Sequence, residues 1–133
     1  MQRLIGHAPD AGEIEELARA ALARLPQQFR VHLADVLLRI EEFADEETLG
    51  ALGIDDPFEL TGLYEGVPLG EKSIAESGTM PDCIRLFRGP ILDEWIARGD
   101  ETLEHLMAHV LIHEVGHHFG LSDADFAKLE ASA

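Results

Sequence analysis

Cysteine is almost absent from this sequence, in which Cys83 stands alone. A single cysteine excludes an intrachain disulfide, so a buried apolar core has to stabilise the fold. The 133 residues, of which 46% are apolar and 27% are charged, are sufficient for such a core in one globular domain. Because proteins without disulfides are typical of reducing compartments, we predict a cytoplasmic location.

Positive charge is also scarce, since 10 Lys and Arg residues stand against 26 Asp and Glu residues, a formal net charge of −16. The acidity is spread along the chain, with −9 in residues 1–66 (5 minus 14) and −7 in residues 67–133 (5 minus 12). Such a surface repels phosphates, so the sequence argues against nucleic-acid binding. The negative charge favours solubility, and it can also attract basic peptides or metal cations.

Long apolar runs are missing too. No stretch approaches the roughly 18 apolar residues that a membrane-spanning helix needs, and residues 1–16 do not resemble a secretory signal. There is no internal repeat or low-complexity tract. We therefore expect no membrane association and a single domain over residues 1–133, with residues 1–12 as an N-terminal extension.

Apolar periodicity and turn residues predict short strands mixed with helices. Helical spacing predicts helices at residues 13–25, 45–53, 91–99, 101–120 and 123–131, with a helical turn at 26–33. Strands are expected at residues 36–43, 59–64 and 83–88, and a long loop at 65–82. The predicted N-caps are Asp10, Asp100 and Ser122. The strand at 83–88 is a candidate for pairing with an extended peptide.

The strongest functional signal is the stretch HEVGHHFGLSD at residues 113–123. His113 and His117 are about 40° apart around a helix, so both imidazoles can bind one ion at Zn–N distances of about 2.0–2.1 Å. Glu114 lies on the next flank, where it can accept a proton from a metal-bound water. Gly120 can end the helix and turn the chain back, so that Asp123 completes the ligand set.

This stretch resembles the zincin pattern H-E-x-x-H-x-x-G-x-x-[H/D]. The segments DPFELTGLYEGVPL (56–69) and DCIRLFRGPI (82–91) are also similar to the small bacterial zincin-like metallopeptidase family, formerly a domain of unknown function. The resemblance covers roughly residues 15–130. It implies a compact α+β zincin-like fold with a short mixed sheet packed on the metal-binding helix. It also implies one zinc ion held by His113, His117 and Asp123, with Glu114 as the general base.

Two nearby side chains are candidates for supporting roles. His109 lies one turn before His113 and is either a neighbour of the metal ligands, a substrate contact or a partly exposed histidine. Tyr64, beside the predicted loop, could donate a hydrogen bond to an oxyanion, and a purely structural tyrosine is the alternative.

Other conspicuous residues have simpler interpretations. We expect His105 to be in solvent and His118 to be a core histidine with satisfied hydrogen bonds. Arg85 and Arg88 are expected to form salt bridges with nearby acids, although a substrate carboxylate is an alternative partner.

Several functions are compatible with this pattern. The first is a zinc-dependent peptidase or related amide hydrolase that acts on a peptide or protein. The second is a metal-binding module that binds a peptide or protein without cleaving it, for which the short chain is the reason. Two histidines and a carboxylate also form the donor set of non-haem iron oxygenases, although the helical pattern favours zinc. A polar helix end without metal is the last alternative.

Overall fold

The computed structural model describes residues 8–66, 82–121 and 124, and of His118 the backbone alone. Within this part of the chain, three short strands form one mixed sheet in the order β1-β3-β2. Strand β1 (Leu37–Glu41) is parallel to β3 (Cys83–Phe87), and β2 (Gly62–Glu65) is antiparallel to β3. The short mixed sheet that the sequence predicts is therefore confirmed.

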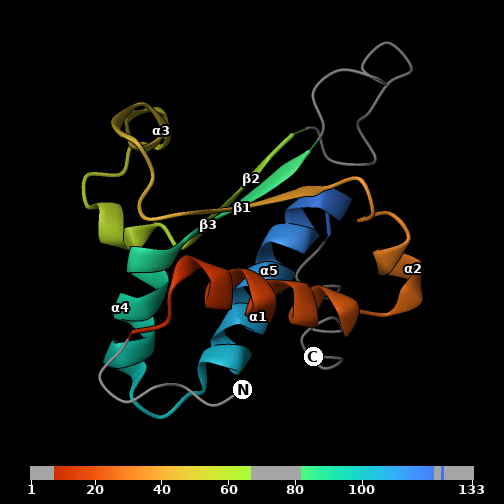
Figure 1. Ribbon diagram of the computed structural model, residues 1–133. Coiled ribbons are helices and arrows are strands. Elements are labelled where there is room, and N and C mark those ends of the chain that lie inside the picture. Colours follow the sequence, from red (N-terminus) through yellow and green to blue (C-terminus); the bar gives the residue numbers. More distant parts are fainter. Residues whose placement is uncertain (1–7, 67–81, 122–123, 125–133) are drawn as a thin grey trace.

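Helices lie on both sides of this sheet. They are α1 (Ala11–Ala23), α2 (Gln27–Arg30), α3 (Glu46–Leu52), α4 (Arg88–Arg98) and α5 (Leu103–Phe119), with a 3₁₀ turn at Pro57–Glu59. Helices α1 and α5 cover one face of the sheet, and α3 lies on the opposite side (Figure 1). The chain thus has the predicted α+β class. In the described part of the chain, no helix combines the length and hydropathy of a membrane-spanning segment.

One of the three predicted caps is confirmed, one is wrong, and the third, Ser122, lies outside the described residues. Asp10 caps α1 by accepting a hydrogen bond from the backbone N–H of Glu13, so α1 begins at Ala11, inside the range assigned to the extension. The predicted cap at Asp100 is wrong, because Thr102 caps α5 instead. Leu103 is 1% exposed and belongs to the core. The helix therefore begins at Leu103, two residues later than a cap at Asp100 would place its start.

The junction between β3 and α4 also differs from the prediction. Gly89 and Pro90 were expected to separate a strand from a helix, but α4 begins at Arg88 and includes both. Proline is compatible with the first helical turn, where a backbone N–H has no acceptor within the helix. Gly89 is needed there because a Cβ atom would lie 2.5 Å from Cζ of Phe43.

Strand β3 is the centre of the sheet, and all five of its residues are buried. It pairs with β1 on one edge and β2 on the other, so the expectation that it binds an extended peptide is wrong. Strand β2 is the candidate instead, since no described strand pairs with its outer edge. The segment predicted as a loop, 65–82, lies largely outside the described residues.

A single arginine connects the strands on the face of the sheet turned away from α5. The guanidinium of Arg85, 7% exposed, donates to both carboxylate oxygens of Glu41 at 2.7 and 3.0 Å. Its Nη1 donates to Glu65 at 2.5 Å and to Oγ1 of Thr48 in α3 at 3.1 Å. Arg88 also forms an ion pair. The prediction of salt bridges for both arginines is confirmed.

The pair between Glu41 and Arg85 should make stability depend on pH. Hydrogen bonds from Arg85 lower the pKa of Glu41. Because the folded-state pKa lies below that of the unfolded chain, the stabilisation is present above the unfolded pKa and is lost as the pH falls through the folded pKa. Glu41→Gln should lower the free energy of unfolding by about 2 kcal/mol at pH 7, measured by urea titration.

The same measurement near pH 3 should show a smaller difference between Glu41→Gln and the wild type. Glu15→Gln is the matched control, because it removes an exposed partner of Arg19 at 3.4 Å and should change stability by less than about 0.5 kcal/mol. An effect of Glu41→Gln that is independent of pH would contradict this account.

Candidate metal centre

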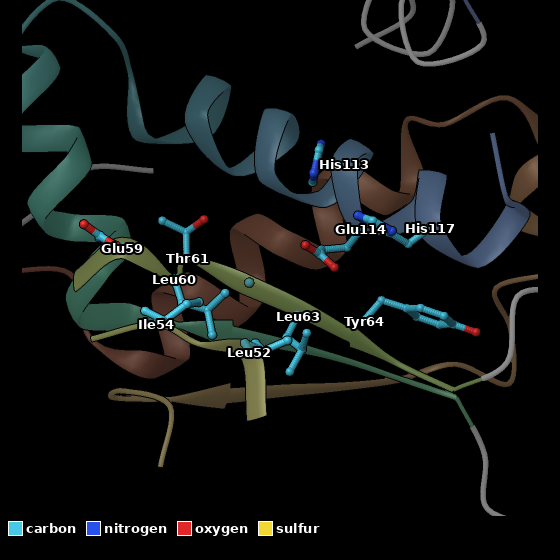
Figure 2. Close-up of a pocket in the computed structure, with 11 residues that line it drawn as sticks. Leu52, Ile54, Glu59, Leu60, Thr61, Leu63, Tyr64, His113, Glu114 and His117 are labelled. Carbon is cyan, nitrogen blue, oxygen red and sulfur yellow. The ribbon is translucent and has the colours of Figure 1, made fainter. Parts of the chain in front are cut away.

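Two imidazoles lie on successive turns of α5 and line the same hollow (Figure 2). The ring centroids of His113 and His117 are 5.1 Å apart, and their planes are inclined by 77°. Two imidazoles that bind one tetrahedral ion at about 2.0–2.1 Å have ring centroids about 5 Å apart. The pair therefore fits a shared metal ion, although both side chains are open to solvent.

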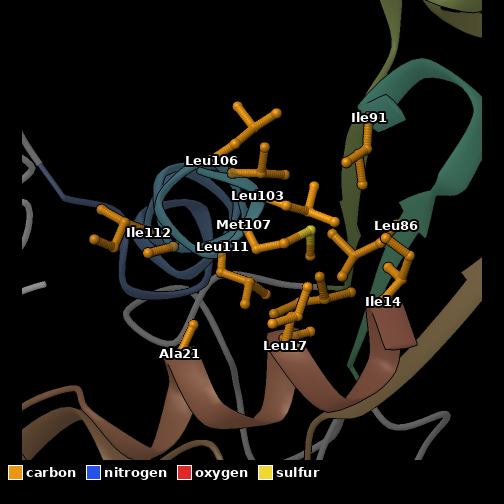
Figure 3. Close-up of a cluster of buried hydrophobic side chains, with 14 of the residues drawn as sticks. Ile14, Leu17, Ala21, Leu86, Ile91, Leu103, Leu106, Met107, Leu111 and Ile112 are labelled. Atoms are coloured by element: carbon orange, nitrogen blue, oxygen red, sulfur yellow. The ribbon is translucent and has the colours of Figure 1, made fainter. Parts of the chain in front are cut away.

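Helix α5 is held in this orientation by the apolar face opposite the imidazoles. Figure 3 shows this face packed against α1 and β3. The residues of α5 that are at most 1% exposed are Leu103, Leu106, Met107, Leu111 and Val115. Their partners in α1 are Ile14, Leu17, Ala18 and Ala21. This burial agrees with the helical spacing of apolar residues that predicts the helix at 101–120, and it fixes which residues of α5 reach the solvent.

The helix ends where the predicted return of the chain requires it. Gly120 has a φ of 65°, the left-handed conformation that glycine adopts without strain, and its N–H caps the last turn. Leu121 donates its N–H to the carbonyl of Gly116 at 2.9 Å. Asp123 lies outside the described residues, so its role as third ligand stays a prediction. Among the described side chains, no group of three metal-binding residues is present.

The side chain of Glu114 points in a different direction from the imidazoles of His113 and His117. Its side chain is buried, with 6% exposed, and its carboxylate accepts a hydrogen bond from the backbone N–H of Tyr64. Burial raises the pKa of Glu114 to about 7, and the hydrogen bond opposes this shift. A carboxyl group whose pKa lies near neutrality is suited to accepting a proton and returning it.

A glycine allows β2 to lie directly against α5. A Cβ atom on Gly62 would be 3.3 Å from Cγ1 of Val110, a tight contact, and 3.4 Å from Cγ of Glu114, at the near limit of ordinary van der Waals contact. The missing side chain therefore brings the strand within hydrogen-bonding distance of the buried carboxylate. The strand prediction at 59–64 contained Gly62, but no sequence pattern indicated that a backbone N–H of this strand would contact Glu114.

The Tyr64 side chain takes part in a separate interaction. Its hydroxyl group hydrogen-bonds with the carboxylate of Asp82, and burial together with the Asp82 charge raises the pKa of the phenol. Both partners lie close to Gly66, where a Cβ atom would collide with the Asp82 carboxylate. Tyr64 lines the hollow, and its role as oxyanion donor stays a prediction.

The other histidines of α5 differ in their surroundings. His109 is exposed and lines a second, smaller hollow of about 190 Å³ that shares His113 and Glu114 with the first, so its supporting role stays a prediction. His105 is 72% exposed and lies 2.6 Å from a carboxylate oxygen of Glu101, which confirms its expected contact with solvent. The side chain of His118 lies outside the described residues.

The two hollows share Thr61, His113 and Glu114, and the larger one runs along β2. The larger one has a volume of about 420 Å³ and combines metal-binding and apolar side chains. Its lining consists of Leu52, Ile54, Glu59, Leu60, Thr61, Gly62, Leu63, Tyr64, His113, Glu114 and His117. The structure thus places a pair of imidazoles on α5 beside an edge strand, with the buried carboxylate of Glu114 against that strand.

Comparison with known families agrees with this arrangement. A family model described as a zincin-like metallopeptidase matches residues 33–133, and the chain belongs to this family. The match includes the whole sheet and α5, whereas α1, which packs directly on α5, precedes it. No curated protein is significantly similar to the chain.

The two imidazoles should be required for metal binding. His113→Ala and His117→Ala should each weaken zinc affinity by at least about 100-fold, because loss of a direct ligand costs more than loss of a supporting residue. Asp123→Ala should have a similar effect if Asp123 is the third ligand. The affinity can be measured by competition with a chromogenic chelator.

His105→Ala is the matched control, since it removes an exposed imidazole from the same helix and should leave zinc affinity unchanged. Unaltered affinity of the His113→Ala and His117→Ala variants would exclude the proposed pair of ligands.

Proposed function

We propose that this protein is a zinc-dependent peptidase that hydrolyses peptide bonds in an extended substrate. The observation that carries the proposal is the buried carboxylate of Glu114, held by a backbone N–H of β2 beside two imidazoles with the spacing of metal ligands. Membership of the zincin-like metallopeptidase family supports it.

Each residue of the proposed site has a separate role in this reaction. A zinc ion held by His113, His117 and Asp123 would supply a water of lowered pKa and polarise the substrate carbonyl. Glu114 accepts the proton of the attacking water and delivers it to the leaving amine. Its burial keeps bulk water away, and the Tyr64 N–H fixes the direction of the carboxylate. The positive charge of the metal would lower the pKa of Glu114 from about 7, which favours the ionised, proton-accepting form.

The outer edge of β2 is suited to hold the substrate backbone. The carbonyl of Thr61 bonds to the N–H of Phe87 in β3 at 2.9 Å, so the peptide groups of Gly62 and Tyr64 face the other way by strand alternation. The N–H of Tyr64 in fact reaches Glu114 on this outer side. A peptide added to this edge would therefore pass directly over the general base.

Replacing the general base should separate catalysis from metal binding. Glu114→Gln should retain zinc, because Glu114 does not share the direction of the imidazoles, and should lower kcat by about 10²–10⁴-fold on a peptide library. Products can be identified by mass spectrometry, and the zinc content by elemental analysis. Glu16→Gln makes the same chemical change at an exposed position of α1 and should leave both quantities unchanged.

Two outcomes would favour the competing functions. Unchanged turnover by Glu114→Gln would reject the mechanism, and a zinc-loaded wild type that binds peptides without forming products would identify a peptide-binding module. Protein purified without added metal should contain about one zinc ion per chain, whereas iron in that preparation would favour an oxygenase.

A further inference from the structure

The larger hollow extends beyond the metal-binding residues to an apolar wall. The wall consists of Leu52 at the end of α3, Ile54, Leu60 and Leu63. Figure 2 shows these side chains on the other side of β2 from the imidazoles and Glu114. Leu52 is 47% exposed, and the other three are only partly buried. The wall thus presents apolar surface to the same hollow that contains the proposed base.

Strand geometry determines which part of a substrate can reach this wall. In β2, Gly62 faces Val110 and Glu114 of α5, so the next residue, Leu63, faces the opposite side of the sheet. A peptide paired with the outer edge of β2 alternates in the same way. Of the two residues that flank the scissile bond, one therefore directs its side chain to the α5 side and the other to the apolar wall.

The wall is held in place before any substrate arrives. Arg85 donates hydrogen bonds to Thr48 in α3 at 3.1 Å and to Glu65 in β2 at 2.5 Å. One side chain therefore connects the helix that carries Leu52 to the strand that carries Leu63. A site fixed in this way does not lose binding energy to ordering of its own residues.

The charge of the hollow restricts the substrate further. Among the residues that line it, the acidic ones are Glu59 and Glu114, and none is Lys or Arg. The whole chain carries a formal net charge of −16. Acidic peptides are repelled by this surface, whereas basic peptides are attracted to it.

We propose that Leu52, Ile54, Leu60 and Leu63 bind a large apolar side chain next to the scissile bond of a neutral or basic peptide. This inference rests on the proposed peptidase function and adds the class of substrate. A leucine-sized side chain that leaves water for such a wall should gain about tenfold to 100-fold over serine at the same position.

The test uses short peptides rich in lysine and alanine that differ at one central position, occupied by leucine or serine. The wild type should cleave the leucine peptide with the higher kcat/KM, at a bond next to the leucine. Leu52→Ser should reduce the ratio of leucine to serine kcat/KM about tenfold, chiefly through a higher KM for the leucine peptide. Leu37→Ser is the matched control, because Leu37 is 50% exposed on β1, at the other edge of the sheet.

Equal kcat/KM for the two peptides, or an equal loss on both in Leu52→Ser, would overturn the inference and leave the peptidase function intact. A binding measurement separates the two proposals if no turnover is found. Labelled peptides bound to zinc-loaded Glu114→Gln should show, by fluorescence anisotropy, a Kd about tenfold lower for leucine than for serine. Adding Leu52→Ser to Glu114→Gln should remove this difference. Equal Kd values for the two peptides in the Glu114→Gln single variant would also overturn the inference.

Discussion

The burial of one face of α5 is the constraint on which the site depends. Among the described side chains of this helix, the exposed ones are His105, His109, His113 and His117, at intervals of four residues. Along a helix, the next residue points about 100° further round. For His113 this neighbour is Glu114, so the packing that exposes the imidazole also buries the carboxylate. Helical geometry thereby separates the proposed ligand His113 from the proposed base Glu114 without any further structural element.

Two groups of polar side chains, one around Glu114 and one around Arg85, lie on opposite faces of the sheet. On the α5 side, Glu114 has the backbone of β2 as its partner, and burial dominates its pKa. On the opposite side, Arg85 is surrounded by carboxylates of β1 and β2, and these raise the pKa of its guanidinium. Because Arg85 bonds to Glu65 of β2, the position of the Tyr64 N–H depends in part on an ion pair whose residues do not line the hollow. Stability and site geometry are therefore coupled through one strand.

The sequence predicted the fold class and the local geometry of α5, but not the order of the strands. Local spacing defines the relation of His113, Glu114 and His117, and the helical stop at Gly120 followed from the conformational freedom of glycine. The order of the strands could not be read from local patterns, because it depends on pairing between distant residues, and β3 was mistaken for an accessible strand. Backbone groups such as the Tyr64 N–H carry no sequence signal at all.

The packing of α1 on α5 has a consequence for the order of folding. The two helices lie near opposite ends of the described chain, and the parallel pairing of β1 with β3 also joins distant segments. Non-local contacts of this kind form only after the entropy of closing a long loop has been lost, and they slow folding. During synthesis α1 leaves the ribosome long before α5. The apolar face of α1 therefore cannot be packed against α5 until α5 has been made. The imidazole pair should consequently reach its final orientation late, after α1 has packed on α5.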